Sequence, residues 1–197
     1  MATRSNSSKE RILASAESII LQKGFSATSI EDLIDKAAIA KSDFFYHFES
    51  KLVLAEALVE RYLKQDDEIF AELKNQARAL SEDPLHRLLI FLKLLFDLMS
   101  QLEYTHPGCL VASFTYESQQ FHRSIRDSMK ARLIIWRNMI LEQLNAINQQ
   151  YDAQTEVSMK TFADMFTGII EGGIMLARAF EDNRLLVEQI LAYRAFL

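Results

Sequence analysis

The chain has 197 residues, of which 49% are apolar and 25% charged, a balance typical of a globular protein rather than a disordered one. Its net charge of −5 argues mildly against a nucleic-acid binder, and its single cysteine, Cys109, excludes an internal disulfide and fits a reducing cytoplasm. The start of the chain has no apolar signal-peptide region, and the most apolar run, "LLIFLKLLFDLMS", is too short and too charged to cross a bilayer. We therefore expect a cytoplasmic protein with no membrane segment.

The negative charge is unevenly distributed along the chain. Residues 1–52 carry seven basic and seven acidic residues, so the whole excess of acid lies in residues 53–197. A neutral N-terminal region can still present a basic edge to DNA. The charge therefore permits a nucleic-acid function without indicating one.

Glycine and proline are scarce, with 5 and 2 residues, and none of them lies between Gly24 and Pro84. Strands joined by tight turns need more of both, whereas long helices do not. Apolar residues recur at helical spacing, and no alternating segment is long enough to be a strand. The sequence predicts an all-α protein of about nine helices, over residues 8–22, 29–36, 40–46, 50–75, 84–103, 109–118, 122–148, 155–179 and 184–196.

Local signals mark where the first helices begin and end. The sequence predicts a mobile arm over residues 1–8, with a capping box over residues 7–10 at the start of the first helix and a second box over residues 28–31. Gly24 is placed to end the first helix. Asp83 precedes Pro84 as an N-cap precedes a first-turn proline.

Residues 28–51, "TSIEDLIDKAAIAKSDFFYHFESK", predict two short helices joined by a three-residue turn. Such helices cannot bury their own apolar faces, so they need the helix over residues 8–22 behind them. This arrangement is a helix-turn-helix, whose second helix can enter the major groove of DNA. Not all of the aromatic side chains in this helix can be exposed, and we expect Phe45 and Phe48 to pack against the long helix that follows.

The same region resembles the DNA-binding part of the TetR/AcrR family of bacterial repressors. The family pattern has Gly-Phe/Tyr-x-x-Thr-Ser/Thr, an aliphatic helix, a turn and a segment ending Tyr-x-Phe-x-x-Lys, and it appears here as "GFSATSIEDLIDKAAIAKSDFFYHFESKLVL". The resemblance covers residues 8–54. It implies a DNA-binding domain over residues 1–52 and a ligand-binding and dimerisation domain over residues 53–197.

Short polar, basic and flat aromatic side chains around the second helix are the candidate DNA contacts. Those at helix N-termini suit phosphates, and those on the second helix suit base edges. The candidates are Thr28, Ser29, Lys41, Ser42, Asp43, Phe44, Tyr46, His47 and Lys51. Two positions depart from the family pattern: Ala38 stands where a turn glycine is usual, and Ala40 stands where Ser or Thr usually caps the helix.

The last two predicted helices are the candidate surface for a homodimer, which a two-fold symmetric operator requires. Gly168 and Gly172 are four residues apart and so share one face, where they permit close approach of another helix. The resemblance implies a four-helix bundle between subunits at this place. The candidate interface residues are Phe162, Phe166, Ile169, Gly172, Leu186 and Ile190, with core packing as the alternative.

The middle helices are apolar on nearly every side, which indicates burial. The resemblance places a pocket for a small-molecule effector here, and the Phe and Met content suggests an apolar or aromatic one. The candidate pocket residues are Phe91, Leu95, Met99, Cys109, Phe114, Trp136, Met139 and Met165. The alternative is that this aromatic and Met set is simply core.

Cys109 follows His106-Pro107-Gly108 and is expected in the first turn of a helix, where a thiolate is stabilised. We therefore hypothesise a reactive sensor of oxidants or electrophiles, with a small buried apolar residue as the alternative. The Gly-Cys-Leu sequence also resembles a branch of the family that contains cysteine-based sensors.

Two other classes of protein remain as alternatives. A di-iron helical bundle needs two Glu-x-x-His motifs, and residues 103–106 supply one. A helical adaptor without a DNA role leaves residues 41–51 unexplained. We expect no catalytic residues, no metal and no cofactor, and a homodimer that releases a palindromic operator when a small molecule or cysteine modification acts on the C-terminal domain.

Overall fold

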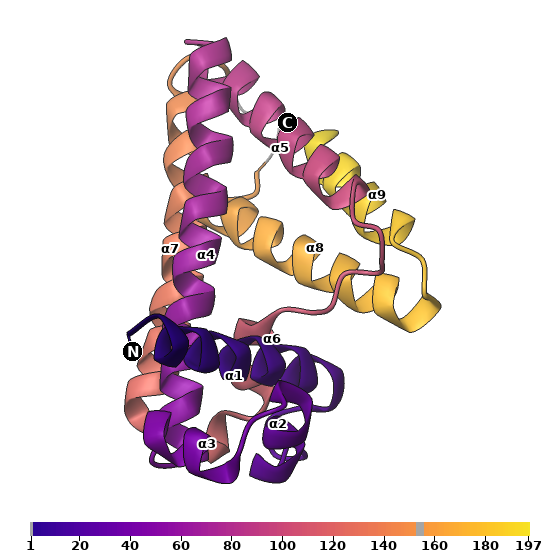
Figure 1. Ribbon diagram of the computed structural model, residues 1–197. Helices are drawn as coiled ribbons and strands as arrows, with labels where there is room; N and C mark the ends of the chain where they lie inside the picture. The colour runs from indigo at the N-terminus through magenta and orange to yellow at the C-terminus, as the bar shows by residue number, and fades with distance from the viewer. Residues whose placement is uncertain (1, 153–155) are drawn as a thin grey trace. The chain divides into compact units, whose positions relative to one another are not determined.

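The computed structural model describes residues 2–152 and 156–197, which contain helices and no strand (Figure 1). The all-α prediction is confirmed. The nine α helices of the described residues are α1 (Ala2–Lys23), α2 (Ile30–Ala37), α3 (Lys41–His47), α4 (Lys51–Leu80), α5 (Pro84–Ser100), α6 (Leu110–Tyr116), α7 (Arg123–Asn148), α8 (Met159–Phe180) and α9 (Arg184–Arg194), with a 3-10 turn, η1, at Ser118–Gln120.

The start of the first helix differs from the prediction. Because α1 begins at Ala2, residues 7–10 lie inside the helix, and both the mobile arm and the first capping box are wrong for the described residues. The end of α1 is as predicted: Gly24 follows its last residue with φ +87° and donates its N–H to the Ile20 carbonyl at 2.8 Å. Gly24 thus ends α1 in a backbone conformation that glycine adopts at little cost.

Other helix ends differ from the predicted ends by a few residues. Asp83 caps α5 by accepting the His86 N–H at 2.8 Å, with Pro84 in the first turn, as predicted. Of the helix expected over residues 155–179, residue 155 lies outside the described residues, and the helix begins at Met159 behind its N-cap Ser158. No helix of the described residues is long and apolar enough to cross a membrane.

The described chain divides into two compact units, to both of which α4 and α7 contribute. The first unit comprises Met1–Gln65 and Pro107–Met129, and the second comprises Asp66–His106 and Lys130–Leu197. The first unit therefore contains the predicted helix-turn-helix together with α6 and the start of α7. The functional boundary after residue 52 stays a prediction.

The first unit is built on the apolar face of α1, which packs against α2, α3 and α6 (Figure 1). Ile12, Ile20 and Leu33 have almost no exposed surface. Phe25, two residues after α1, packs on Phe121 with ring centroids 4.7 Å apart. These contacts give the short helices α2 and α3 the buried support that they lack by themselves.

The second unit has its own core, to which α5, α8 and α9 contribute most of the buried side chains. Phe162 of α8 stacks on Tyr193 of α9 with ring centroids 5.0 Å apart, and the Tyr193 hydroxyl donates to the Phe162 carbonyl at 3.1 Å. Burial raises the pKa of Tyr193 above its ordinary value, so this hydroxyl stays a donor. Gly173 lets α8 and α9 approach closely, because a Cβ there would lie 3.0 Å from Leu186 Cδ1.

Candidate nucleic-acid interface

The turn between α2 and α3 has the geometry of a helix-turn-helix. Ala38 follows α2 in the left-handed conformation with φ 50°, and its N–H bonds to the Asp35 carbonyl at 3.2 Å. This is the position where the resemblance favours glycine, and alanine there carries a steric cost of roughly 1–2 kcal/mol. The chain therefore makes the turn with a strained residue in place of a permissive one.

Asp43 replaces the helix cap that Ala40 cannot supply. Ala40 has no side-chain acceptor, but the Asp43 carboxylate accepts the Ala40 N–H at 3.4 Å. This is the reciprocal half of a capping box, and it places a carboxylate in the first turn of α3, where the helix dipole favours it. Asp43 is exposed, so its predicted DNA contact stays a prediction beside this capping role.

The aromatic residues of α3 lie on two different faces of the helix, one buried and one exposed. Phe44 is fully buried and Phe48, just after the helix, is 2% exposed, whereas Phe45 is 46% and Tyr46 77% exposed. The prediction of Phe44 as a DNA contact and of Phe45 as a packing residue is therefore wrong in both parts. The reason is helical geometry: Phe44 and Phe48 are four residues apart and share the face that packs on the core.

The exposed face of α3 keeps the other predicted contacts available. Lys41, Ser42 and Tyr46 are exposed, and His47 is half-buried, with its ring nearly perpendicular to that of Tyr46 and the ring centroids 4.9 Å apart. Lys41 forms an ion pair with Glu31 at 3.3 Å in which both side chains are about two-thirds exposed. Such an exposed pair contributes little, so the Lys41 ammonium can turn to a phosphate at small cost.

The N-terminus of α2 is capped one residue later than predicted. Ser29 is the N-cap: its hydroxyl accepts the Asp32 N–H at 3.0 Å, and the Asp32 carboxylate accepts the Ser29 N–H at 2.7 Å. Hydrogen bonds from Lys23 and Ser29 lower the pKa of Asp32, so this carboxylate is ionised. Thr28 is 1% exposed and donates to the Gly24 carbonyl at 2.7 Å, so the prediction of Thr28 as a side-chain contact is wrong.

Lys51 lies at the start of α4 and reaches back to the turn before α2. Its ammonium donates to the carbonyls of Phe25 at 2.6 Å and Thr28 at 2.5 Å, and it lies 4.2 Å from the centroid of the Phe25 ring. Burial lowers the pKa of Lys51. These two hydrogen bonds tie α4 to this turn, and the predicted phosphate contact of Lys51 stays a prediction.

Glu117 supports the helix-turn-helix in a way that the sequence patterns did not indicate. It follows α6, yet its carboxylate accepts the N–H groups of Phe25 and Ser26, each at 2.7 Å, and the Ser26 hydroxyl. Burial by itself raises the pKa of Glu117, but the bonds from Ser26 and Phe25 and the charge of Lys51 outweigh it, so the pKa lies below its ordinary value. A Cβ on Gly24 would lie 2.8 Å from the Glu117 Oε1 atom.

Glu117 and Lys51 therefore hold the segment between α1 and α2 from two sides. This segment leads directly into the N-cap of α2, so its conformation sets where the helix-turn-helix begins. No sequence signal pointed to Glu117, because it lies more than ninety residues from its partners and belongs to no recognisable motif.

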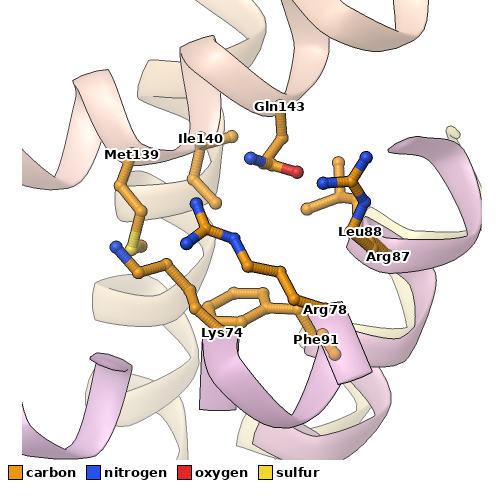
Figure 2. A pocket seen from close by; sticks show the side chains of 9 residues that line it. Lys74, Arg78, Arg87, Leu88, Phe91, Met139, Ile140 and Gln143 are labelled. Atoms are coloured by element: carbon orange, nitrogen blue, oxygen red, sulfur yellow. The ribbon is translucent and has the colours of Figure 1, made fainter. Parts of the chain in front are cut away.

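The predicted effector residues do not form one group. Phe91 and Met139 line a pocket of the second unit (Figure 2), together with Lys74, Arg78 and Arg87, which were not predicted. Leu95 belongs to the core of the second unit, and Met99 and Met165 pack against that core. Trp136 donates a hydrogen bond to Asp66 within the same unit. Cys109 and Phe114 belong to the first unit.

Cys109 is 7% exposed and is the N-cap of α6, where its sulfur accepts the Ala112 N–H at 3.5 Å. The predicted position at a helix start is thus confirmed. Its burial limits attack by a reagent in solution, and its role as a sensor stays a prediction.

Most of the predicted dimer residues are buried inside the chain itself. Phe162, Phe166, Leu186 and Ile190 are at most 8% exposed, so the prediction that they lie between subunits is wrong. The core-facing and partner-facing stripes of these helices are both apolar, and sequence alone does not separate them. Ile169 is half-buried, and a Cβ added to Gly172 would meet nothing within 4 Å, so these positions stay candidates.

The comparisons with known proteins agree with this geometry. Residues 12–58 match the model of bacterial regulatory proteins of the tetR family, and residues 84–192 match the tetracyclin repressor-like C-terminal domain. An uncharacterized HTH-type transcriptional regulator of Lactococcus lactis is 26% identical over 90% of this chain and 87% of its own length. The transcriptional repressor NemR of Escherichia coli is 26% identical over 61% of this chain and 59% of its own length.

A solved structure of a TetR-family regulator from Agrobacterium tumefaciens shares the fold over 97% of both chains, with a TM-score of 0.81 and 21% identity. The C-terminal family model alone covers more than half of the chain. The chain therefore belongs to the TetR family and is a DNA-binding transcriptional regulator.

Proposed function

We propose that the protein is a homodimeric repressor, which binds a two-fold symmetric operator through α3 and releases it when a small molecule acts on the C-terminal part. The observation that carries this proposal is the exposed face of α3. Lys41, Ser42 and Tyr46 offer a charge, a hydroxyl and a flat aromatic ring, while Phe44 and Phe48 fix the helix from behind. A rigid helix with such an exposed face suits the major groove.

The dimer proposal is supported by an open face on α8. Gly168, Gly172 and Met175 follow one another at spacings of four and three residues, so they share a face. A Cβ added to either glycine would meet nothing within 4 Å, and Met175 is 61% exposed. Small residues with an exposed apolar neighbour allow a helix of a second copy to approach closely. Two copies related in this way present two heads to a palindromic site.

Regulation is proposed as a shift between two states of the dimer. An effector changes DNA affinity only if it binds the two states with different affinities. The proposal of repression rather than activation draws on relatives such as NemR, which is named a transcriptional repressor.

The test is selection of bound sequences from a library of random duplexes by the purified protein. We expect enrichment of a palindrome whose half-sites lie about one helical turn, or a multiple of it, apart. A Tyr46→Ala variant should lose the enrichment, whereas Tyr104→Ala, which removes an 82% exposed tyrosine outside the helix-turn-helix, should keep it. Failure of the wild-type protein to enrich any sequence would favour the helical adaptor instead.

A further inference from the structure

The turn between α1 and α2 is held by two charged side chains that do different work. The Lys51 ammonium donates to carbonyl groups of the turn, and the Glu117 carboxylate accepts its N–H groups. An ammonium accepts no hydrogen bond and a carboxylate donates none when ionised. Neither side chain can therefore replace the other.

Glu117 reaches the turn from a rigid backbone. Figure 1 shows α6 beside α1, and the two helices are in contact. Phe114 of α6 is 1% exposed, and its ring stacks on that of Phe121 with centroids 4.4 Å apart. Glu117 is the C-cap of α6, where its N–H donates to the Ser113 carbonyl at 3.2 Å. The carboxylate is thus presented from a fixed position.

The position of Glu117 in the sequence differs from its position in the fold. The C-terminal family model matches residues 84–192, a range that contains Glu117. By its contacts, however, the segment Pro107–Met129 belongs to the first unit, together with the helix-turn-helix. The DNA-binding domain predicted over residues 1–52 therefore lacks the acceptor of two of its own N–H groups.

Loss of this acceptor affects the turn that leads into the helix-turn-helix. Phe25 is 5% exposed, so its N–H cannot exchange Glu117 for water without movement of the backbone. Ser29, the N-cap of α2, lies three residues after Ser26. A backbone that moves at Ser26 therefore changes how α2 begins, and through α2 it changes the orientation of α3.

We propose that Glu117 is a positioning residue for DNA binding, so that the DNA-binding unit is discontinuous and is completed by α6. Glu117 makes no contact with DNA. It holds the turn in the one conformation that presents α3 correctly, and without it each DNA-binding unit samples other orientations. The inference rests on the proposed function, because it takes α3 of both subunits as the helices that read the operator.

The test is fluorescence anisotropy of the full-length protein on its selected operator across a salt series, with the folded fraction of each sample measured by circular dichroism. If each subunit of the variant dimer is competent about a third of the time, binding through both weakens about tenfold. We therefore expect Glu117→Ala to lose about tenfold or more in operator affinity.

Two features of this loss separate positioning from other effects. Removal of a negative charge by itself favours binding to DNA, so long-range electrostatics predicts the opposite sign. The slope of log Kd against log salt should keep its wild-type value, because no phosphate contact is lost. A slope flattened by about 1 would show a lost phosphate contact and would contradict the inference.

Two further variants complete the comparison. Glu117→Gln keeps the shape and one acceptor oxygen, so it should lose less affinity than Glu117→Ala, and it carries the test if Glu117→Ala does not fold. Tyr116→Ala removes the neighbouring side chain, which is 88% exposed, and should bind as wild type does. Wild-type affinity in the folded Glu117 variants would refute the inference, whereas a wild-type protein that selects no duplex would count against the proposed function.

Amide hydrogen exchange tests the turn without DNA. In Glu117→Ala we expect exchange at Phe25 and Ser26 to accelerate by a larger factor than exchange at Leu92, which lies in the core of the second unit. Equal factors would indicate a general loss of stability, and unchanged exchange at Phe25 and Ser26 would show that Glu117 does not hold the turn. Either result would overturn the inference even if no operator has been found.

Discussion

Glu117→Ala tests how the helix-turn-helix is held. The change removes the acceptor of two backbone N–H groups, on Phe25 and Ser26, and of the Ser26 hydroxyl. A hydrogen bond to a charged group contributes about 1.5–3 kcal/mol. Ser26 is exposed and its N–H can return to water, whereas Phe25 is 5% exposed, so most of the loss comes from Phe25. We expect the free energy of unfolding to fall by about 2 kcal/mol.

The assay is urea denaturation followed by circular dichroism, at constant protein concentration because a dimer's stability depends on it. In thermal unfolding the same loss corresponds to a lower midpoint by roughly 4–8 °C. Glu142→Ala, at an exposed position of α7, is the control and should stay within about 0.5 kcal/mol of wild type. If Glu117→Ala is as stable as Glu142→Ala, the carboxylate does not hold this turn and the reasoning fails.

The lowered pKa of Glu117 also predicts that its contribution to the free energy of unfolding depends on pH. The folded-state pKa of Glu117 is lowered, so its contribution is fully present above the unfolded value of about 4.5 and is lost as the pH falls through the folded value. The stability difference between wild type and Glu117→Gln should therefore be constant near neutral pH and shrink below about pH 4.5. A difference that stays constant down to pH 3 would contradict the lowered pKa.

Three other predictions follow from local geometry. Ala38→Gly relieves the left-handed alanine and should raise the free energy of unfolding by about 0.5–1 kcal/mol, measured by urea denaturation; a loss of stability would show that the turn is not strained. Gly172→Leu adds a side chain where the single chain has open space, so light scattering should show dissociation of the dimer to folded monomers. Gly173→Ala should instead destabilise the fold, because its Cβ meets Leu186. A Gly172→Leu protein that stays dimeric would show that this face of α8 is not the dimer interface. Cys109 is buried, so iodoacetamide should alkylate it more slowly in the native protein than in urea, which would count against the sensor hypothesis; a faster native rate would contradict this expectation and support a reactive thiolate.

The sequence predicted the fold class and the helix-turn-helix well, because both depend on local spacing. Gly24 acts through its own backbone, and Asp83 and Pro84 act within the first turn of the helix that they begin; the structure places all three as predicted. Side-chain direction was harder to predict. Phe44 and Phe45 are adjacent and chemically identical, and which of them faces the core depends on the angle at which α3 packs on α1.

Interactions between distant parts of the chain could not be predicted at all. Glu117 matches no motif, and its partners Phe25 and Ser26 lie in a turn of ordinary composition. The pocket lined by Lys74, Arg78 and Arg87 could be predicted only in part, because Lys74 and Arg78 are four residues apart and so share a face of α4. Arg87 belongs to another helix, and only the fold brings it to the same pocket.

The most direct test of the account is fluorescence anisotropy of the wild-type protein on its selected operator and on random duplex across a salt series. The account predicts tight, selective binding that weakens steeply with salt, since every neutralised phosphate adds about 0.9 to the magnitude of the logarithmic slope. It also predicts that Tyr46→Ala loses affinity while Tyr104→Ala does not. Equal binding to operator and random duplex, or unchanged binding by Tyr46→Ala, would contradict the claim that the exposed face of α3 reads DNA.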